Sequence, residues 1–178
     1  MESSTEHPAL DQFKGFLMTN PTEQSFAPMP YSVPYRVASL SSRKPNRFDL
    51  TPDRATRDAI ATYLGITAVA KLRFVGMISP KGRHDFVLEA VLEAVVEQPC
   101  GITLAPVQTR LREEVLRIYL SALALPDAVE MEIPEDDNTE PLAEVIDAGH
   151  VVVEALALAL PPFPRVEGAE LDSAQFAA

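Results

Sequence analysis

The stretch that decides the fold reads HDFVLEAVLEAVVE, residues 84–97. Every second position, beginning with Phe86, is apolar, and the positions between alternate valine with acidic residues. A period of two is typical of a half-buried strand. The composition would also suit a helix, but a helix would stack Glu89, Glu93 and Glu97 in one row of like charges. The pattern therefore favours a strand, and with it a fold built on an antiparallel sheet.

The neighbouring segments predict two partner strands. Residues 66–78 alternate apolar with basic positions, and Ser79–Arg83 is a turn by composition. The side chains expected to face the core are those of Ala68, Ala70, Leu72 and Phe74. A connection at 99–106 leads to a further strand at 107–120. There an antiparallel register would set three arginines against the three glutamates, namely Arg110, Arg112 and Arg117 against Glu89, Glu93 and Glu97.

Capping signals predict two helices. The first follows a basic loop at 41–47 and a short approach from Phe48. It begins after Thr51 as N-cap, with Pro52 at its first position, and ends at Gly65. The second begins after Asp147 and ends before Pro161. The residues expected to be buried are Ala55, Ile60, Ala61 and Leu64 in the first helix, and Val151, Val152, Ala155, Leu156 and Ala159 in the second.

The remaining segments predict edge strands, an arm and a tail. Residues 31–40 alternate in polarity around Pro34, which argues for an edge strand. Residues 129–133 alternate within an acidic stretch and predict a short exposed edge strand. The expected fold is α+β: an antiparallel meander of about four to six strands with two main helices, one near each end of the folded region. The expected organisation is a flexible N-terminal arm at 1–30, a single α+β domain at 31–164 and a C-terminal tail at 165–178.

The charge distribution narrows the function. The chain of 178 residues has a formal net charge of −11, which excludes indiscriminate coating of RNA, and no DNA partner is expected. The charge is divided unevenly, since residues 36–83 hold ten basic and three acidic residues, a net +7. Residues 127–147 hold nine acidic residues and no basic one, a net −9. Either the two stretches pair within the folded chain, or they present separate surfaces to different partners.

The sequence offers little for catalysis or metal binding. Cys100 is the single cysteine, and its spacing from the three histidines suits neither a nucleophile-base pair nor a zinc site. The acidic stretch does not match a calcium loop, so no cofactor is expected. The N-terminus has no apolar export segment, and the longest apolar run, 151–160, is too short to cross a membrane. We therefore expect no membrane contact and a cytoplasmic location.

Two segments carry a family resemblance. Residues 95–107, VVEQPCGITLAPV, resemble a strand, cysteine-containing turn and return strand of the large ribosomal RNA subunit accumulation (YceD) family. Residues 146–161, IDAGHVVVEALALALP, are similar to that family's helix motif. The resemblance covers about residues 30 to 170 and rests on the family-motif positions Cys100, Thr103, Asp147, Gly149, Glu154 and Pro161.

The resemblance implies a role in accumulation or processing of large-subunit ribosomal RNA, without a known catalytic activity. Many members resemble zinc proteins in carrying Cys-x-x-Cys at the turn, whereas this chain has Thr103 at the second position. One thiolate cannot hold a structural zinc, so the metal does not carry over. His150 stands where the family has glutamate, which removes one arm of a capping box.

These observations predict a non-enzymatic ribosome-biogenesis factor that contacts large-subunit ribosomal RNA or a ribosomal protein. The candidate RNA-contact residues are Arg43, Lys44, Arg47, Lys71, Arg73, Lys81 and Arg83. The alternative is an acidic adaptor for a basic ribosomal protein, without direct RNA contact, through Glu130, Glu132, Glu135, Asp136 and Asp137. A carboxylate-metal hydrolase built on the acidic stretch is a third hypothesis.

Overall fold

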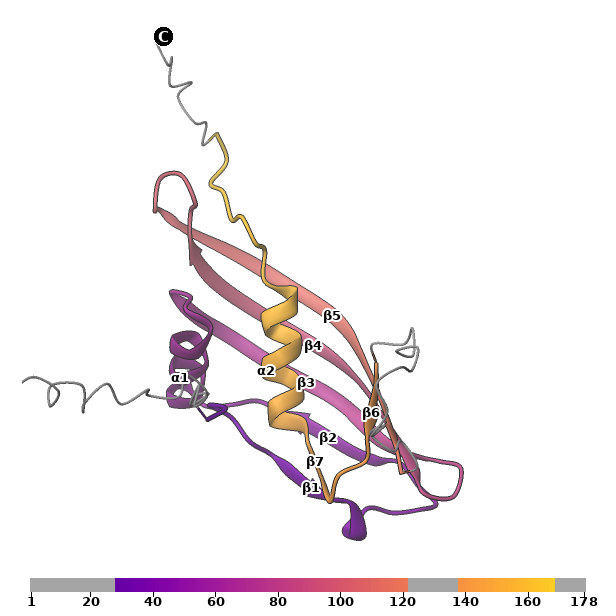
Figure 1. Ribbon diagram of the computed structural model, residues 1–178. Coiled ribbons are helices and arrows are strands. Elements are labelled where there is room, and N and C mark those ends of the chain that lie inside the picture. Colours follow the sequence, from indigo (N-terminus) through magenta and orange to yellow (C-terminus); the bar gives the residue numbers. More distant parts are fainter. Residues whose placement is uncertain (1–27, 122–137, 169–178) are drawn as a thin grey trace, which may run out of the picture.

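The fold is an arched sheet with two helices. The computed structural model describes residues 28–121 and 138–168. Five strands form the main sheet in the order β2-β3-β4-β5-β6 (Figure 1). They span, in chain order, Asn46–Leu50, Ala68–Lys81, Asp85–Pro99, Pro106–Leu120 and Thr139–Pro141. Neighbours are antiparallel except β5 and β6, which run parallel. With the helices α1, Arg54–Leu64, and α2, Ala148–Ala159, this confirms the predicted α+β fold.

The strand β4 is the centre of the sheet, as its period of two predicts. It pairs with β3 on one side and with β5 on the other along nearly its whole length. The alternate side chains on its inner face are all buried, and they are Phe86, Leu88, Ala90, Leu92, Ala94 and Val96. The helical alternative for this stretch is therefore wrong.

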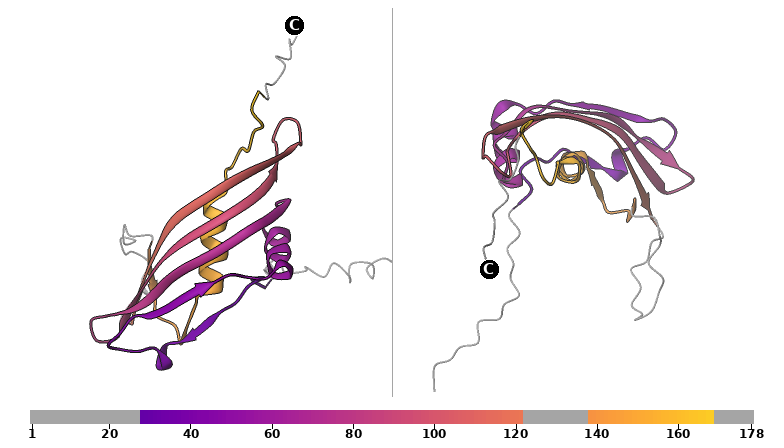
Figure 2. Two further views of the ribbon diagram at one scale, coloured as in Figure 1. Left: turned by 180° about the vertical axis from the view of Figure 1, so that it is seen from behind. Right: turned by 90° about the horizontal axis from the view of Figure 1, so that it is seen from above.

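The helix α2 lies in the concave side of the arch, where it buries most of its apolar residues against the sheet (Figure 2). Its N-cap is Asp147, as predicted, and its last residue is Ala159, which agrees with the predicted end before Pro161. Four of the five residues expected to be buried are buried, and Ala159 is partly buried. The left view of Figure 2 shows the convex face of the sheet from behind. No described helix or strand covers this face over β3, β4 and β5.

A small second sheet ties the first described segment to α2. The strand β1, Pro34–Arg36, pairs antiparallel with β7, Val145–Asp147. The predicted strand at 31–40 is thus shorter than expected, because a 3-10 turn at Val37–Ser39 follows β1 directly. Pro34 lies in a two-stranded sheet, in which every strand is an edge, so its missing N–H is tolerated.

Two further predictions about local structure are wrong. The chain forms the strand β2 at Asn46–Leu50, where we expected a loop and the approach to a helix. The N-cap of α1 is Asp53, not Thr51, because the Asp53 carboxylate accepts a hydrogen bond from the Thr56 N–H at 2.9 Å. The helix ends at Leu64 with Gly65 in the left-handed conformation, as predicted. Of the four residues expected to be buried, Ile60 and Ala61 are buried, Leu64 is partly buried and Ala55, in the first turn, is exposed.

The predicted alternation of buried and exposed residues along β3 is wrong at one point. A register shift between Val69 and Lys71 buries Val69 and leaves Ala70 exposed, against the expected order. Such a bulge inserts one extra residue and reverses the alternation beyond it. The strand also continues through Ser79–Lys81, so the turn at Gly82 is tighter than the composition indicates.

Several predictions fall on residues that the structure does not describe. Almost all of the predicted arm, the edge strand at 129–133 and most of the predicted tail lie outside the described residues. The candidate protein-contact residues also lie there, and they are Glu130, Glu132, Glu135, Asp136 and Asp137.

Candidate nucleic-acid interface

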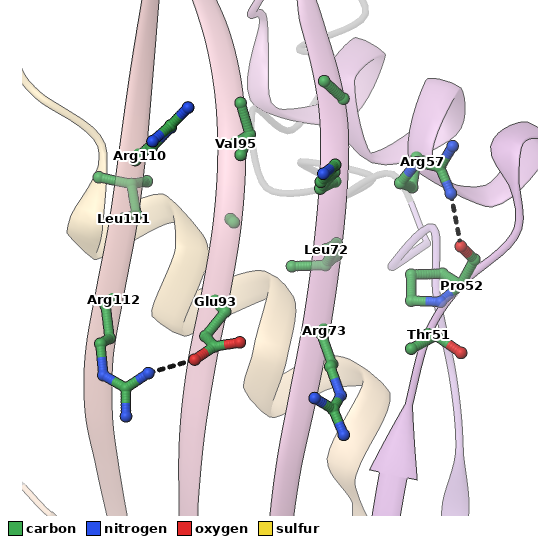
Figure 3. Close-up of a pocket in the computed structure, with 13 residues that line it drawn as sticks. Thr51, Pro52, Arg57, Leu72, Arg73, Glu93, Val95, Arg110, Leu111 and Arg112 are labelled. Carbon is green, nitrogen blue, oxygen red and sulfur yellow. Dashed lines mark hydrogen bonds and ion pairs between the residues drawn. The ribbon is translucent and has the colours of Figure 1, made fainter.

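A basic groove crosses the convex face of the sheet. It has a volume of about 600 Å³ and runs over β3, β4 and β5 to the start of α1 (Figure 3). Its floor includes Val95, and Pro52 closes one end. Its five cationic side chains, which we call the groove cations, are Arg57, Lys71, Arg73, Arg110 and Arg112. Glu93 is the one acidic residue among those lining it.

The sheet register brings the groove cations together from distant parts of the chain. Arg73 of β3 lies opposite Glu93 of β4, which in turn lies opposite Arg112 of β5. Two residues further along β4, Val95 lies opposite Lys71 of β3 on one side and opposite Arg110 of β5 on the other. The bulge in β3 contributes, because it sets Lys71 on the exposed face in register with this row.

The groove cations differ in how their charge is balanced. Arg73 makes a two-pronged ion pair with Asp49, at 2.7 and 3.0 Å, which raises the pKa of Arg73 and lowers that of Asp49. Arg112 pairs with Glu93. Lys71 and Arg110 form no ion pair with any described residue. The groove therefore keeps a surplus of positive charge in a chain whose total is −11.

Arg57 is fixed by the backbone instead of by an acid. Its guanidinium donates to the Pro52 carbonyl at 2.8 Å and to the Val69 carbonyl at 3.1 Å. These bonds satisfy two of its five donors. Arg57 forms no ion pair with a described residue, although its charge helps to lower the pKa of the Asp53 carboxyl. Arg57 thus adds a fixed positive charge at the end of the groove nearest α1 (Figure 3).

The seven candidate RNA-contact residues do not form one surface. Lys71 and Arg73 line the groove, whereas Lys81 and Arg83 lie at the β3–β4 turn, at the other end of the sheet. Ten residues of strand at about 3.3 Å each separate Lys71 from Lys81 by about 33 Å. The other three belong to that distal end, since β2 pairs from Asn46 with Ile78, and they are Arg43, Lys44 and Arg47.

Sequence reasoning missed three of the groove cations. Arg110 and Arg112 were expected to face glutamates, and this holds for Arg112 and Glu93. Arg110 instead lies opposite Val95. Arg117 is on the inner face opposite Leu88, and its Nε lies 3.2 Å from a Glu140 carboxylate oxygen. Strand side chains alternate between faces, so the odd-numbered position of Arg117 could have been separated from the even-numbered positions of Arg110 and Arg112. No pattern in the sequence places Arg57 in the groove.

None of the family-motif residues lines the groove. They lie near the two ends of α2, except Glu154, which is in the middle of the helix. Cys100 is buried in the turn after β4. Hydrogen bonds from the Thr103 side chain and from the N–H groups of Thr103, Val166 and Ile102 lower the pKa of the Cys100 thiol to about 6. The same turn holds the segment after Pro161, because the Gly101 N–H donates to the Pro164 carbonyl at 3.0 Å.

The described residues at this turn do not fit a zinc site. Thr103 occupies the second ligand position, and its N–H donates to the Cys100 sulfur at 3.5 Å. Among the described residues, no three His, Cys, Asp or Glu side chains lie close enough to share a metal ion. The interactions at Cys100 are therefore the hydrogen bonds of a structural turn.

Asp147 and Gly149 join α2 to the start of the described chain. The Asp147 carboxylate accepts from the Ser32 hydroxyl at 2.5 Å, from Val33 N–H at 2.7 Å and from Gly149 N–H at 2.9 Å. A side chain at Gly149 would collide with the segment that precedes β1, because a Cβ there would lie 2.7 Å from Val33 N. Glu154 is exposed on α2. Asp147 and Gly149 thus have structural roles, since both hold the start of α2 against the segment that precedes β1.

The fold and the groove define an α+β protein in which a single helix packs inside an arched, mostly antiparallel sheet with a cationic outer groove. The family model of the large ribosomal RNA subunit accumulation protein YceD matches residues 88–176, half of the chain. The chain belongs to this family, as the two motifs predict. Comparison with curated proteins and with solved structures finds no match. Neither described α-helix is long and apolar enough to span a membrane.

Proposed function

We propose that the protein is a non-enzymatic ribosome-biogenesis factor that binds large-subunit ribosomal RNA directly through the basic groove. Family membership links the chain to accumulation of that RNA. The observation that carries the proposal is the pair of unbalanced cations, Lys71 and Arg110, on either side of Val95. Fixed cations on an otherwise acidic molecule favour local contact with phosphates over general adhesion.

The groove suits a sugar-phosphate backbone better than unstacked bases. None of its lining residues is aromatic, so it offers no platform on which bases could stack. Its two rows of cations are separated by two residues along the strands, about 6.6 Å. That separation is comparable to the distance between successive phosphates of a nucleic-acid strand. We infer that affinity arises from phosphates and that RNA sequence is read weakly.

The distal basic end is proposed as a second contact. Arg43 and Lys44 belong to a loop whose N–H groups donate to the Ser41 hydroxyl, at 3.3 and 3.1 Å. Together with Lys81 and Arg83 at the β3–β4 turn, they extend the positive surface beyond the groove. This end supplies electrostatic support and is secondary to the groove.

A binding experiment with matched variants tests this assignment. The full chain is titrated against fragments of large-subunit ribosomal RNA, with affinity read by filter binding. Lys71→Glu with Arg110→Glu removes the unbalanced groove cations, and we expect a loss of at least about tenfold. Lys81→Glu with Arg83→Glu makes the same charge change at the distal end, where we expect a smaller loss.

The comparison separates the possible outcomes. Equal affinity of the groove variant and the unchanged protein would refute direct contact through the groove. A larger loss in the distal variant would move the main contact to the β3–β4 turn. In cells, the groove variant should fail to restore large-subunit ribosomal RNA levels in a depleted strain. Restoration by that variant would favour an adaptor that works through protein alone. Purified protein should show no nuclease activity with divalent cations.

A further inference from the structure

The open edge of β5 is a second surface that the RNA proposal does not use. On one side β5 pairs with β4 from Pro106 to Tyr119 without a register shift. On the other side β6 covers only Ile118–Leu120. The remaining length, from Pro106 to Arg117, has no strand neighbour among the described residues.

The hydrogen bonds to β6 reveal which backbone groups of this edge point outward. Ile118 donates its N–H to the Asn138 carbonyl at 2.8 Å, and the Leu120 carbonyl accepts from Leu142 N–H at 3.0 Å. Alternate residues of a strand direct their backbone groups to the same side. The outward N–H and C=O groups therefore belong to exposed residues with no described backbone partner there, and these are Gln108, Arg110, Arg112, Glu114 and Leu116.

A groove lies beside the C-terminal half of this edge, between β5 and the C-terminal end of α2. Its volume is about 450 Å³, and its apolar wall includes Ala155, Leu158 and Pro161. Leu158 has an exposed fraction of 80 %, unusual in a helix that otherwise buries its leucines and valines. The edge thus offers both unpaired backbone groups and an apolar wall that an added strand could cover.

The electrostatics of this groove are negative. Glu113 and Glu114 line it, and neither forms an ion pair with a described residue. The last turn of α2 contains no basic residue, so the partial negative charge of the helix end adds to theirs. Arg117, which also lines the groove, is already paired with Glu140. Because the arginines nearest to these two glutamates, Arg112 and Arg117, are already paired with Glu93 and Glu140, charge favours a basic occupant.

We propose that an extended segment of a partner protein, rich in lysine or arginine, binds by strand addition along β5 from Arg112 to Leu116. Its backbone pairs with the outward groups of β5, and its side chains alternate between the two faces of the sheet. On the convex face its basic side chains reach Glu114, which lies opposite Val91. On the concave face its side chains lie beside Glu113, opposite Leu92, and cover Leu158 with apolar groups, including the methylene stems of lysine. The site shares only Arg112 with the basic groove, through the backbone of that residue, and does not depend on RNA binding there.

The probe is a labelled synthetic peptide of alternating lysine and valine, titrated into the full chain with fluorescence anisotropy as readout. The unchanged protein should bind it, and a matched peptide of alternating glutamate and valine should not bind. Glu113→Lys with Glu114→Lys should weaken binding about tenfold, from the loss of two attractive and the gain of two repulsive contacts. Leu116→Pro removes one outward N–H and should weaken binding similarly.

Control variants keep the test decisive. Lys71→Glu with Arg110→Glu should not weaken peptide binding, and the Glu113, Glu114 variant should not weaken RNA binding. If Leu116→Pro loses its circular dichroism signal, Leu158→Ser replaces it, since that exposed side chain is not part of the core. Unchanged peptide affinity in the Glu113, Glu114 variant would overturn the proposal. So would sedimentation showing a dimer that the peptide displaces, because the edge would then belong to a second copy.

Discussion

At the residue scale, Gly149 shows how one missing side chain fixes the position of α2. Replacing a helical glycine by alanine normally stabilises a helix by up to about 1 kcal/mol. Here the new Cβ would lie 2.7 Å from Val33 N and 2.8 Å from Ser32 Cα, both backbone atoms that cannot rotate away. We expect overpacking to prevail, so that Gly149→Ala lowers the free energy of unfolding by about 1 to 3 kcal/mol in urea titrations.

Gly101→Ala is the matched control. A Cβ at Gly101 would meet nothing closer than the Pro164 carbonyl oxygen at 3.9 Å, an ordinary contact. Its unfolding midpoint should therefore stay near that of the unchanged protein. If Gly149→Ala were as stable as this control, the close approach of Val33 to α2 would be wrong.

Asp147 predicts a pH dependence of stability. Burial raises the pKa of Asp147, but hydrogen bonds from Ser32, Val33 and His150, with the nearby His150 side chain, outweigh burial and hold the pKa below its ordinary value. A carboxylate with a lowered folded pKa stabilises the fold above its unfolded pKa of about 3.9 and loses that contribution as pH falls through the folded value.

The measurement compares the unchanged protein with Asp147→Asn, which retains a good N-cap but no charge. We expect the unchanged protein to be more stable by about 1 to 2 kcal/mol at neutral pH, because hydrogen bonds to a charged group are the stronger ones. The difference should shrink below about pH 4, as Asp147 is protonated. A difference that stayed constant down to pH 3 would mean that the carboxylate is not held as the structure shows.

At the element scale, β4 was predictable because burial on one face imposes a period of two on the sequence. Leu92 is fully buried beneath α2, whereas its neighbour Val91 lies half-buried on the convex face. Leu92→Ala should therefore cost about 2 to 5 kcal/mol, and Val91→Ala less than about 1 kcal/mol. Chemical denaturation of the two variants measures the difference. Similar losses at both positions would be incompatible with a strand covered on one face only.

The elements that escaped prediction lack such a periodic signal. The strand β2 has one fully buried side chain, Phe48, so its five residues carry too short a pattern to be distinguished from a loop. The sequence does not distinguish Thr51 from Asp53 as N-cap, because both residue types cap helices well and each has an N–H three residues on. The structure selects Asp53, which accepts from Thr56 N–H. The bulge at Ala70 is set by pairing with β4, which local sequence does not encode.

Only part of the basic groove could be predicted from the sequence, because the groove also depends on how the strands pair. The run of cations at 36–83 pointed to Lys71 and Arg73. Arg110 and Arg112 belong to a stretch where basic and acidic residues alternate, so charge counting along the chain hides them. They join the groove because antiparallel pairing brings position 95 opposite 110 and position 93 opposite 112. A surface built across strands becomes visible once the register is known.

At the scale of the whole molecule, the net charge of −11 coexists with a local positive groove. The dependence of RNA affinity on salt concentration should show how many cations contact phosphates. Each neutralised phosphate contributes about 0.7 to 0.9 to the slope of log affinity against log salt. If all five groove cations contact RNA, they contribute about 3.5 to 4.5 to the magnitude of the slope, and the distal basic end adds a smaller contribution. Lys71→Glu with Arg110→Glu removes two contacts and should reduce the slope by about 1.4 to 1.8.

The slope also distinguishes a local contact from a broad one. Lys81→Glu with Arg83→Glu makes an identical charge change at the distal end and should reduce the slope less, because that end is the secondary contact. The net charge of the molecule is the same in both variants, so it cannot account for a difference between them. Equal reductions would mean that total charge, not the groove, governs binding. A slope near zero in the unchanged protein would show that phosphates contribute little, and the convex face would then have to bind RNA through Val95 and its apolar neighbours or not at all.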